Sequence, residues 1–285
     1  MKTGIQYSMI YSPFSCYGDD KFNKIKEFGF DAVDFGMTVT DDDLYRLSKE
    51  EADKILLKEK HLAQKAGILI NQVHGPCGMP PPEMKYGGIE KRMEQMKRSL
   101  YNTSVLGCKY TVIHPLMPFG VTDKGTNAEK KTLEANVEFF KELGKYASEV
   151  GVTICIENMP MMEFSIATPK EVLNLVKAID NDHVRICLDT GHLAVHAGLD
   201  IGVEVRRLGN YLKVLHVHDN HAGDDCHLFP YKGRLDWQEF KNALDDTGFD
   251  GVISVEIPVP EKMPLNLRED MFRFMANIAR HIANL

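Results

Sequence analysis

The sequence predicts an α/β fold, a single (β/α)₈ barrel that occupies residues 1–285 as one domain. Eight short apolar runs of β type alternate with amphipathic helical patterns along the whole chain. Strands that alternate with helices pair in parallel, and eight such units predict closure into a barrel, which typically needs about 250 residues. In addition, the last four runs each end in a carboxylate or an imidazole, which predicts a metal site at the carboxyl-terminal rim.

The elements follow from local patterns taken in chain order. The predicted strands occupy residues 4–10, 32–36, 68–75, 110–115, 152–158, 184–190, 212–219 and 251–258. Apolar residues at helical spacing predict helices over 50–66 and 129–150, each followed by a glycine. The segment 168–171 (TPKE) predicts a capping box with proline at the first helical position, and 236–239 (DWQE) predicts a second cap of that kind.

The longest irregular stretches follow strands, at residues 75–88, 116–128 and 220–235. In a β/α barrel these are the loops on the catalytic face. The proline- and glycine-rich loop 75–88 is either a lid over the site or a passive excursion.

Composition argues against several function classes. The chain has 34 Lys and Arg against 41 Asp and Glu, a net charge of −7, which gives no electrostatic footprint for nucleic acid or an anionic membrane. The first residues contain no signal-peptide h-region, and no apolar stretch approaches membrane-spanning length. Six cysteines without CxxC spacing predict reduced thiols in a cytoplasmic protein.

The candidate metal site combines the four strand-end residues Glu157, Asp189, His216 and Glu256. Two glutamates, an aspartate and a histidine form an oxygen-rich set suited to a divalent cation. Unpaired carboxylates placed together would repel one another, and a cation removes that conflict. The alternative is that these groups pair with Lys and Arg at the rim.

Alternation along the strands supports this arrangement. Residues of equal parity share a face, so Glu157 should lie above Cys155 and Asp189 above Cys187. Both carboxylates would then stand over small, inward-facing side chains. His216 and His218 also share parity; we take the deeper His216 as the ligand and leave His218 as a substrate contact or filler.

A second set of polar residues surrounds the first. It comprises His74, His114, His192, Asp225 and His227, all at strand ends or in the loops that follow them. These residues are predicted to bind substrate hydroxyls or further metal ions.

These motifs resemble the xylose-isomerase-like sugar phosphate isomerase/epimerase superfamily, which also contains nucleases of the endonuclease IV type. The resemblance covers nearly the whole chain. It rests on IEN at 156–158, CLDTGHLAVHAGLD at 187–200, LHVHDN at 215–220, DCHLFPYKGRLDW at 225–237 and SVEIP at 254–258.

The resemblance to the isomerase branch implies roles for individual residues. Glu157, Asp189, His216 and Glu256 would bind a divalent metal, with Mn²⁺ expected first and Zn²⁺, Co²⁺ or Mg²⁺ as alternatives. Glu157 and Glu256 would also act as the acid/base pair. Glu163 and His192 match substrate-contacting residues of ketose 3-epimerases.

The resemblance to the nuclease branch implies a zinc-dependent phosphodiesterase acting on abasic DNA. Its nine zinc-ligand positions are all occupied by suitable residues: His74, His114, Glu157, Asp189, His192, His216, Asp225, His227 and Glu256. Several departures oppose it. The nuclease has cysteine at the position of Gly191, a different sequence at 218–221 and an early glycine–serine–histidine motif that is missing here. Asp41, Asp42 and Asp43 would line the rim unfavourably for a phosphate backbone.

We therefore expect a metal-dependent isomerase or epimerase of a ketose, a sugar acid or a related polyol derivative, working by proton abstraction through a metal-stabilised enediolate. A keto-polyol dehydratase would share the first step. The nuclease is the competing enzyme, and a barrel that binds sugar or metal without turnover is the competing non-enzyme. The expected partner is a small carbohydrate, with no nucleic acid and no membrane, and a homo-oligomer is compatible with the sequence.

Overall fold

The predicted (β/α)₈ barrel is confirmed. The computed structural model describes residues 1–8, 13–38, 43–77, 88–260 and 262–285. Its eight strands pair in parallel in the order β7-β6-β5-β4-β3-β2-β1-β8. An isolated parallel bridge between Val217 and Val255 joins the end of β7 to β8 and brings the ring close to closure. The strands are β1 (Lys2–Ser8), β2 (Ala32–Gly36), β3 (Leu69–His74), β4 (Tyr110–Ile113), β5 (Thr153–Glu157), β6 (Val184–Asp189), β7 (Leu212–His216) and β8 (Val252–Val255).

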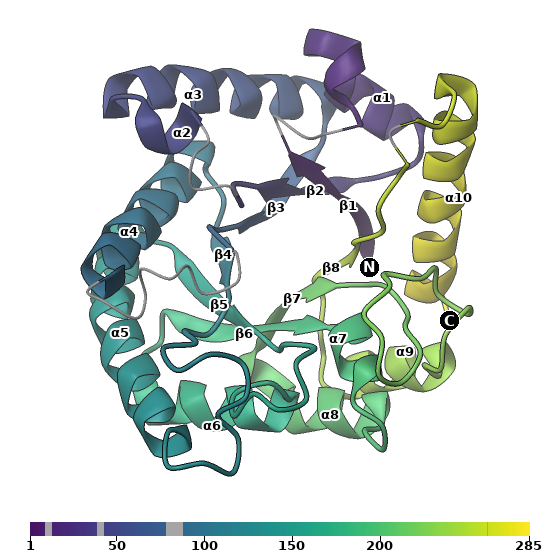
Figure 1. Ribbon diagram of the computed structural model, residues 1–285. Coiled ribbons are helices and arrows are strands. Elements are labelled where there is room, and N and C mark those ends of the chain that lie inside the picture. The colour runs from purple at the N-terminus through teal and green to yellow at the C-terminus, as the bar shows by residue number, and fades with distance from the viewer. Residues whose placement is uncertain (9–12, 39–42, 78–87, 261) are drawn as a thin grey trace.

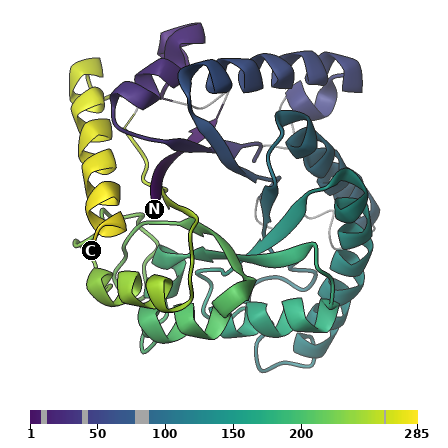
Figure 2. The ribbon, with the colours of Figure 1, turned by 180° about the vertical axis from the view of Figure 1, so that it is seen from behind.

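Helices form an outer layer around the strands (Figure 1), and the view from behind shows the same ring (Figure 2). α10 occupies the place between α9 and α1, so the last helix completes the layer beside the first. The helices are α1 (Lys21–Glu27), α2 (Asp43–Arg46), α3 (Lys49–Ala66), α4 (Gly88–Leu106), α5 (Glu129–Val150), α6 (Pro169–Ile179), α7 (Thr190–Val195), α8 (Ile201–Leu208), α9 (Trp237–Asp246) and α10 (Leu265–Ala283), with short 3₁₀ turns η1 (Ser15–Asp20) and η3 (Gly209–Tyr211).

The predicted helix ends agree with the structure. Gly67 and Gly151 follow α3 and α5 with φ of 68° and 70°, the left-handed conformation that glycine adopts without steric cost. The capping box of α6 is complete, because Thr168 and Glu171 each accept a hydrogen bond from the other's backbone N–H.

The second predicted cap is only half of a box. The Asp236 carboxylate accepts a hydrogen bond from the Glu239 backbone N–H, at 2.9 Å. The Glu239 side chain does not return the bond and instead pairs with Arg206 on α8, at 2.6 Å. The Glu239 carboxylate, which the local sequence pattern assigns to the capping box, is used in an ion pair with another helix instead.

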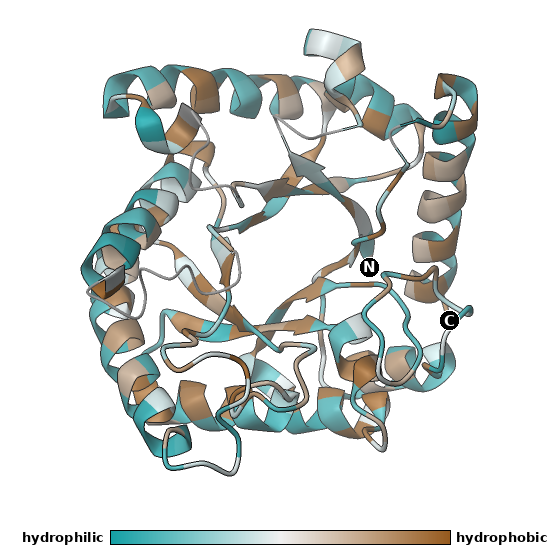
Figure 3. Ribbon diagram, viewed as in Figure 1, coloured by the Kyte–Doolittle hydropathy of each residue, from teal (hydrophilic) through white to brown (hydrophobic). Residues whose placement is uncertain are grey.

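Two apolar clusters hold the barrel. The larger fills the space between the strands and the outer helices, and hydrophobic bands recur along those helices (Figure 3). The smaller consists of Val112, Cys155, Cys187 and Val214. Two residues after each of these four comes a polar residue: His114, Glu157, Asp189 and His216. Because side chains alternate along a strand, each polar residue faces the same inner side as the apolar residue before it, but at the rim.

Two strands contain an extra residue that changes which side chains face inward. Val33 pairs with Ile70 but Asp34 pairs with Gln72, so Asn71 is extra in β3. In the same way, Lys213 is extra in β7, between the partners of Ile186 and Cys187. Such bulges shift the alternation of the strand that carries them.

Some predictions fall on segments that the structure does not cover. Residues 9–10 of the first predicted strand, Asp41, Asp42 and positions 78–87 of the predicted lid lie outside the described residues, while Asp43 begins α2.

Within the described chain, none of the helices combines the length and apolar character needed to cross a bilayer. All six cysteines are unpaired.

Candidate metal centre

The four predicted ligands lie together where β5, β6, β7 and β8 end. Nδ1 of His216 is 2.8 Å from Glu157 Oε1, 2.9 Å from Glu256 Oε2 and 3.9 Å from Asp189 Oδ2. One ligand-capable atom from each of the four falls within 4.8 Å of the others. Glu157, Asp189 and His216 are at most 1% exposed, and Glu256 is the most accessible of the four, with a side chain 16% exposed.

The donor set fits a divalent cation. Oε2 of Glu157 and Oε2 of Glu256 are buried without a hydrogen-bond partner. Within the described residues, the ion pairs of these carboxylates involve only histidines, so the alternative of Lys or Arg partners at the rim is not what the structure shows there. Buried carboxylates without such compensation are costly, and a cation bound between them would remove that cost.

His74 and His114 contact the second carboxylate oxygen of Glu157, and the His74 ring also stacks on His216. Their Nε2 atoms stand 3.5 and 3.0 Å from Glu157 Oε2. His74 also contacts the Gly75 carbonyl oxygen through Nδ1, at 3.0 Å. His74, Glu157 and His216 form a second group with ligand atoms close enough to hold an ion.

Three more of the predicted residues form a third group together with His218. His192, His218, Asp225 and His227 also bring ligand-capable atoms within 4.8 Å of one another. His218 stacks on His227 with ring centroids 3.9 Å apart, and its Nε2 lies 3.0 Å from Asp189 Oδ1. His192 Nε2 lies 3.5 Å from Asp225 Oδ2. The first two groups share Glu157 and His216, and the third group adjoins them through the contact between His218 and Asp189.

A single buried aspartate organises the loop that carries Asp225 and His227. Asp219 accepts hydrogen bonds from the backbone N–H groups of Asn220, Tyr231 and Leu235 and from the Trp237 indole N–H. Asp219 therefore fixes the conformation of the loop 220–235, which contains the site residues Asp225 and His227.

The protonation of the cluster follows from its crowding. Burial alone would raise the pKa of the Glu157 carboxyl, but His216, His114 and His74 hold it well below its usual range. Burial alone would lower the pKa of His216, yet the acidic groups around it, Glu256 and Glu157 among them, raise it well above the ordinary value. In the metal-free protein the carboxylates therefore favour the protonated form of His216.

The imidazoles of the outer groups differ from one another. Burial opposes the charged form of His192, but Asp189 and Asp225 raise its pKa to about 10. The pKa of His74 is likewise raised to about 10, since Glu157 outweighs its burial. His114 is shifted the other way, because its burial outweighs Glu157.

Sequence analysis missed three polar residues of the site. Asp34 on β2 lies 2.8 Å from His216 Nε2. Gln6 on β1 donates from Nε2 to Glu256 Oε1 at 2.9 Å. Asn158 exchanges two hydrogen bonds with the backbone of Asp189, at 2.9 and 2.8 Å. The signal for Asp34 was a lone carboxylate inside the apolar run AVDFG.

Gly191 is required by the packing of His218. A Cβ at position 191 would lie 1.9 Å from His218 Cε1. The chain differs from the nuclease pattern at both position 191 and position 218. The two differences are sterically linked, because the His218 ring leaves no room for a side chain at position 191.

Glu163 is not brought into the cluster. Its side chain is exposed, and its backbone carbonyl accepts a hydrogen bond from the Lys124 N–H at 3.0 Å. Its implied role as a substrate contact stays a prediction.

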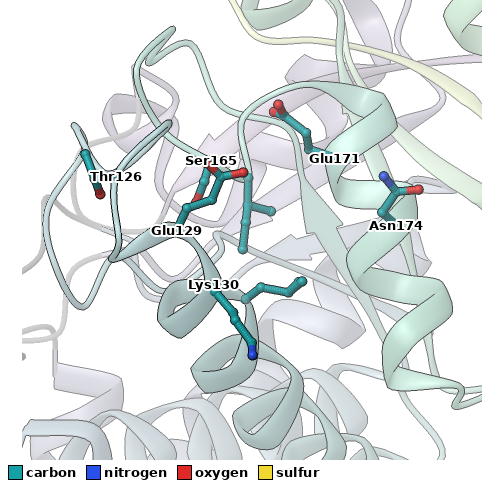
Figure 4. Close-up of a pocket in the computed structure, with 8 residues that line it drawn as sticks. Thr126, Glu129, Lys130, Ser165, Glu171 and Asn174 are labelled. Atoms are coloured by element: carbon teal, nitrogen blue, oxygen red, sulfur yellow. The ribbon is translucent and has the colours of Figure 1, made fainter.

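A separate cavity of about 440 Å³ lies between the start of α5 and α6 (Figure 4). None of the predicted site residues lines it, and its acidic side chains are engaged locally: Glu171 pairs with Lys124, and Glu129 accepts from the Gly125 N–H. We therefore place the chemistry at the rim.

Comparisons with known proteins agree with this architecture. The chain is 27% identical over 263 residues to D-psicose 3-epimerase of Ruminiclostridium cellulolyticum, covering 90% of this chain and 83% of that protein. It is 27% identical over 190 residues to inosose isomerase of Bacillus licheniformis, covering 64% and 66%. A crystal structure of IOLI protein with a bound zinc atom matches with a TM-score of 0.74 at 18% identity, covering 99% and 98%. The model of the family described as xylose isomerase-like TIM barrel matches residues 22–278, and the chain belongs to that family.

Proposed function

We propose that this protein is a divalent-metal-dependent isomerase or epimerase of a ketose, a sugar acid or a related polyol derivative. The observation that carries the proposal is the convergence of Glu157, Asp189, His216 and Glu256 within 4.8 Å at the barrel rim. The relatives support the substrate class, since one acts as a D-psicose 3-epimerase and another as an inosose isomerase. Dehydration of a cyclic keto-polyol shares the first step and remains within the proposal.

The four clustered residues would hold the metal ion. Three carboxylates and one imidazole suit Mn²⁺, our first expectation, and also Zn²⁺, Co²⁺ or Mg²⁺. A bound ion would supply Lewis-acid stabilisation of negative charge that develops on substrate oxygens.

The two glutamates are proposed as the acid/base pair. Glu157 ends β5 and Glu256 follows β8, with β6 and β7 between them, so they reach a substrate from different sides of the rim. One would remove the proton next to the substrate carbonyl, and the other would return a proton to the opposite face or to the neighbouring carbon. Gln6 holds Glu256 Oε1, whereas Oε2 faces His216 Nδ1 at 2.9 Å.

Solvent labelling tests this mechanism. Turnover of D-psicose or D-fructose, or of an inosose, in deuterated water should place deuterium on the reacting carbon. A product without label from an active enzyme would indicate a hydride shift instead. Absence of isomerisation, epimerisation or dehydration of any ketose, sugar acid or inosose by the metal-loaded protein would overturn the proposal.

Variants of the glutamates sharpen the test. Glu157→Gln and Glu256→Gln keep the size but remove the base, so each should lose about 10²–10⁴-fold in kcat. Metal content is measured alongside, because both residues are proposed ligands. Glu142→Gln, on the outer surface of α5 where Glu142 pairs with Lys97, is the matched control and should keep full activity.

A zinc-dependent phosphodiesterase is the second candidate. It is favoured by the three neighbouring ligand groups, since adjacent metal ions suit cleavage of a phosphate ester. It is opposed by the packing of Gly191 against His218 and by the net charge of −7. Salt-sensitive binding to an abasic-site duplex followed by cleavage, with two or three zinc ions per chain, would favour this candidate.

A further inference from the structure

A buried carboxylate on the strand opposite the proposed ligands approaches the ring of His216. Asp34 on β2 is 1% exposed, and its Oδ2 lies 2.8 Å from His216 Nε2. We propose that Asp34 is a positioning residue for the metal centre: its charge fixes which nitrogen of His216 faces the ion and raises the affinity of that nitrogen for it. This inference rests on the metal-dependent function proposed above.

Asp34 is itself held in place by Gln72, which is in turn anchored to β7. Gln72 on β3 donates from Nε2 to the same Oδ2 at 2.9 Å and to the Leu215 carbonyl oxygen on β7 at 3.2 Å. The extra residue Asn71 turns Gln72 to the inner face, and Asn71 Nδ2 donates to Gln72 Oε1 at 2.9 Å. The carboxylate is therefore fixed before any ion binds.

The two ring nitrogens of His216 face different surroundings. Nδ1 points to the carboxylates of Glu157 and Glu256, at 2.8 and 2.9 Å, whereas Nε2 faces Asp34. Oδ2 of Asp34 lies 2.8 Å from Nε2 of His216, close enough for a buried ion pair. A negative charge there favours the ring form with hydrogen on Nε2, which leaves the lone pair of Nδ1 for a metal ion.

A purely structural role does not account for this residue. Asp34 Oδ1 is buried without a hydrogen-bond partner, and the cationic group it meets among the described residues is His216. An apolar residue would fill the same space without the cost of burying a charge. The neighbours Val33 and Phe35 face the outer core and do not share this environment.

Asp34→Asn is the discriminating variant because it keeps the size and an oxygen but removes the charge. We expect the Kd for Mn²⁺, measured from the EPR signal of free ion, to rise by about 10–100-fold. The titration is made at a pH above which the wild-type affinity no longer changes, so that proton competition does not contribute. An unchanged Kd in a folded variant would overturn the inference.

Glu59→Gln is the matched control. Glu59 is also a buried carboxylate, 5% exposed, but it accepts from Tyr7 and Lys21 on the outer side of β1. This variant should lower the melting temperature and leave the Kd for Mn²⁺ unchanged, which separates loss of a buried charge from loss of positioning. A Kd raised equally in both variants would count against a specific role for Asp34.

A second measurement needs no variant. In ¹⁵N NMR of the wild-type protein with diamagnetic Zn²⁺, His216 should keep its hydrogen on Nε2 while the Nδ1 resonance shifts. A metal-induced shift at Nε2 would overturn the inference even if Asp34→Asn did not fold. Wild-type protein that binds neither ion would overturn the metal-dependent function itself and this inference with it, whereas equal binding by wild type and variant overturns only the inference.

Discussion

At the scale of single residues, Asp189 serves several neighbours at the end of β6. Its Oδ1 accepts a hydrogen bond from the His192 backbone N–H at 2.6 Å and so caps α7. The same carboxylate faces His216 and His218. The cap needs only an oxygen, whereas a metal ion needs the charge.

Asp189→Asn should therefore separate folding from metal binding. Asparagine caps a helix about as well as aspartate, so the melting temperature of the metal-free protein should change by only a few degrees. A neutral amide is a much weaker ligand, so bound metal and turnover should both be lost. Metal analysis by mass spectrometry checks this, with Asp182→Asn, an exposed partner of Arg185, as the control. Stoichiometric metal and full turnover in Asp189→Asn would show that the site is misplaced.

Gly191 gives a second prediction at this scale. Its substitution by alanine would place a Cβ against the His218 ring, and overpacking of this kind costs about 1–3 kcal/mol of unfolding free energy. The double variant Gly191→Ala/His218→Ala removes the ring that the new methyl group meets, so it should be more stable than the sum of the two single effects predicts. Denaturant unfolding of the four proteins measures this coupling, and strict additivity would contradict the steric explanation.

At the scale of elements, the loop between β7 and α9 depends on Asp219. Asp219→Ala would leave four N–H donors without their acceptor, which costs about 1–3 kcal/mol or more of unfolding free energy. Backbone hydrogen exchange over 220–235 should become faster. Activity should fall because Asp225 and His227 would no longer be held in position at the site. Asp224→Ala, an exposed change in the same loop, is the control. Unaltered exchange in Asp219→Ala would mean that the loop is held by other contacts.

The strands differ in how far their patterns predict them. In β5 and β6, simple alternation places Cys155 and Cys187 in the inner cluster, as predicted. In β3, alternation from Ile70 fails, because the extra residue Asn71 intervenes before Gln72. A bulge forms from the pairing of two strands, and one strand's residues do not reveal it.

At the scale of the whole molecule, four strands place negative charge around one imidazole, and this couples metal binding to pH. The acidic groups around His216 raise its pKa in the metal-free protein, which favours a proton on Nδ1 beside the carboxylates. A metal ion must displace that proton, so affinity should rise with pH until His216 loses it unaided, and level off above that pH. Calorimetric titration with Mn²⁺ in buffers of different ionisation enthalpy should show release of about one proton per ion. A binding enthalpy that is the same in every buffer would contradict this.

The sequence by itself determined the barrel, the bounds of α5 and the neighbourhood of Glu157, Asp189, His216 and Glu256. It could do so because period and caps are local, and because parallel neighbouring strands must bring their carboxyl ends to one rim. Tertiary structure alone decided that the Glu239 side chain pairs with Arg206 instead of completing the capping box. It also decided that Gln6 on β1 and Asp34 on β2 reach the cluster. Those contacts join residues 33 to 250 positions apart, and their geometry depends on bulges and on closure of the ring, which no local pattern contains.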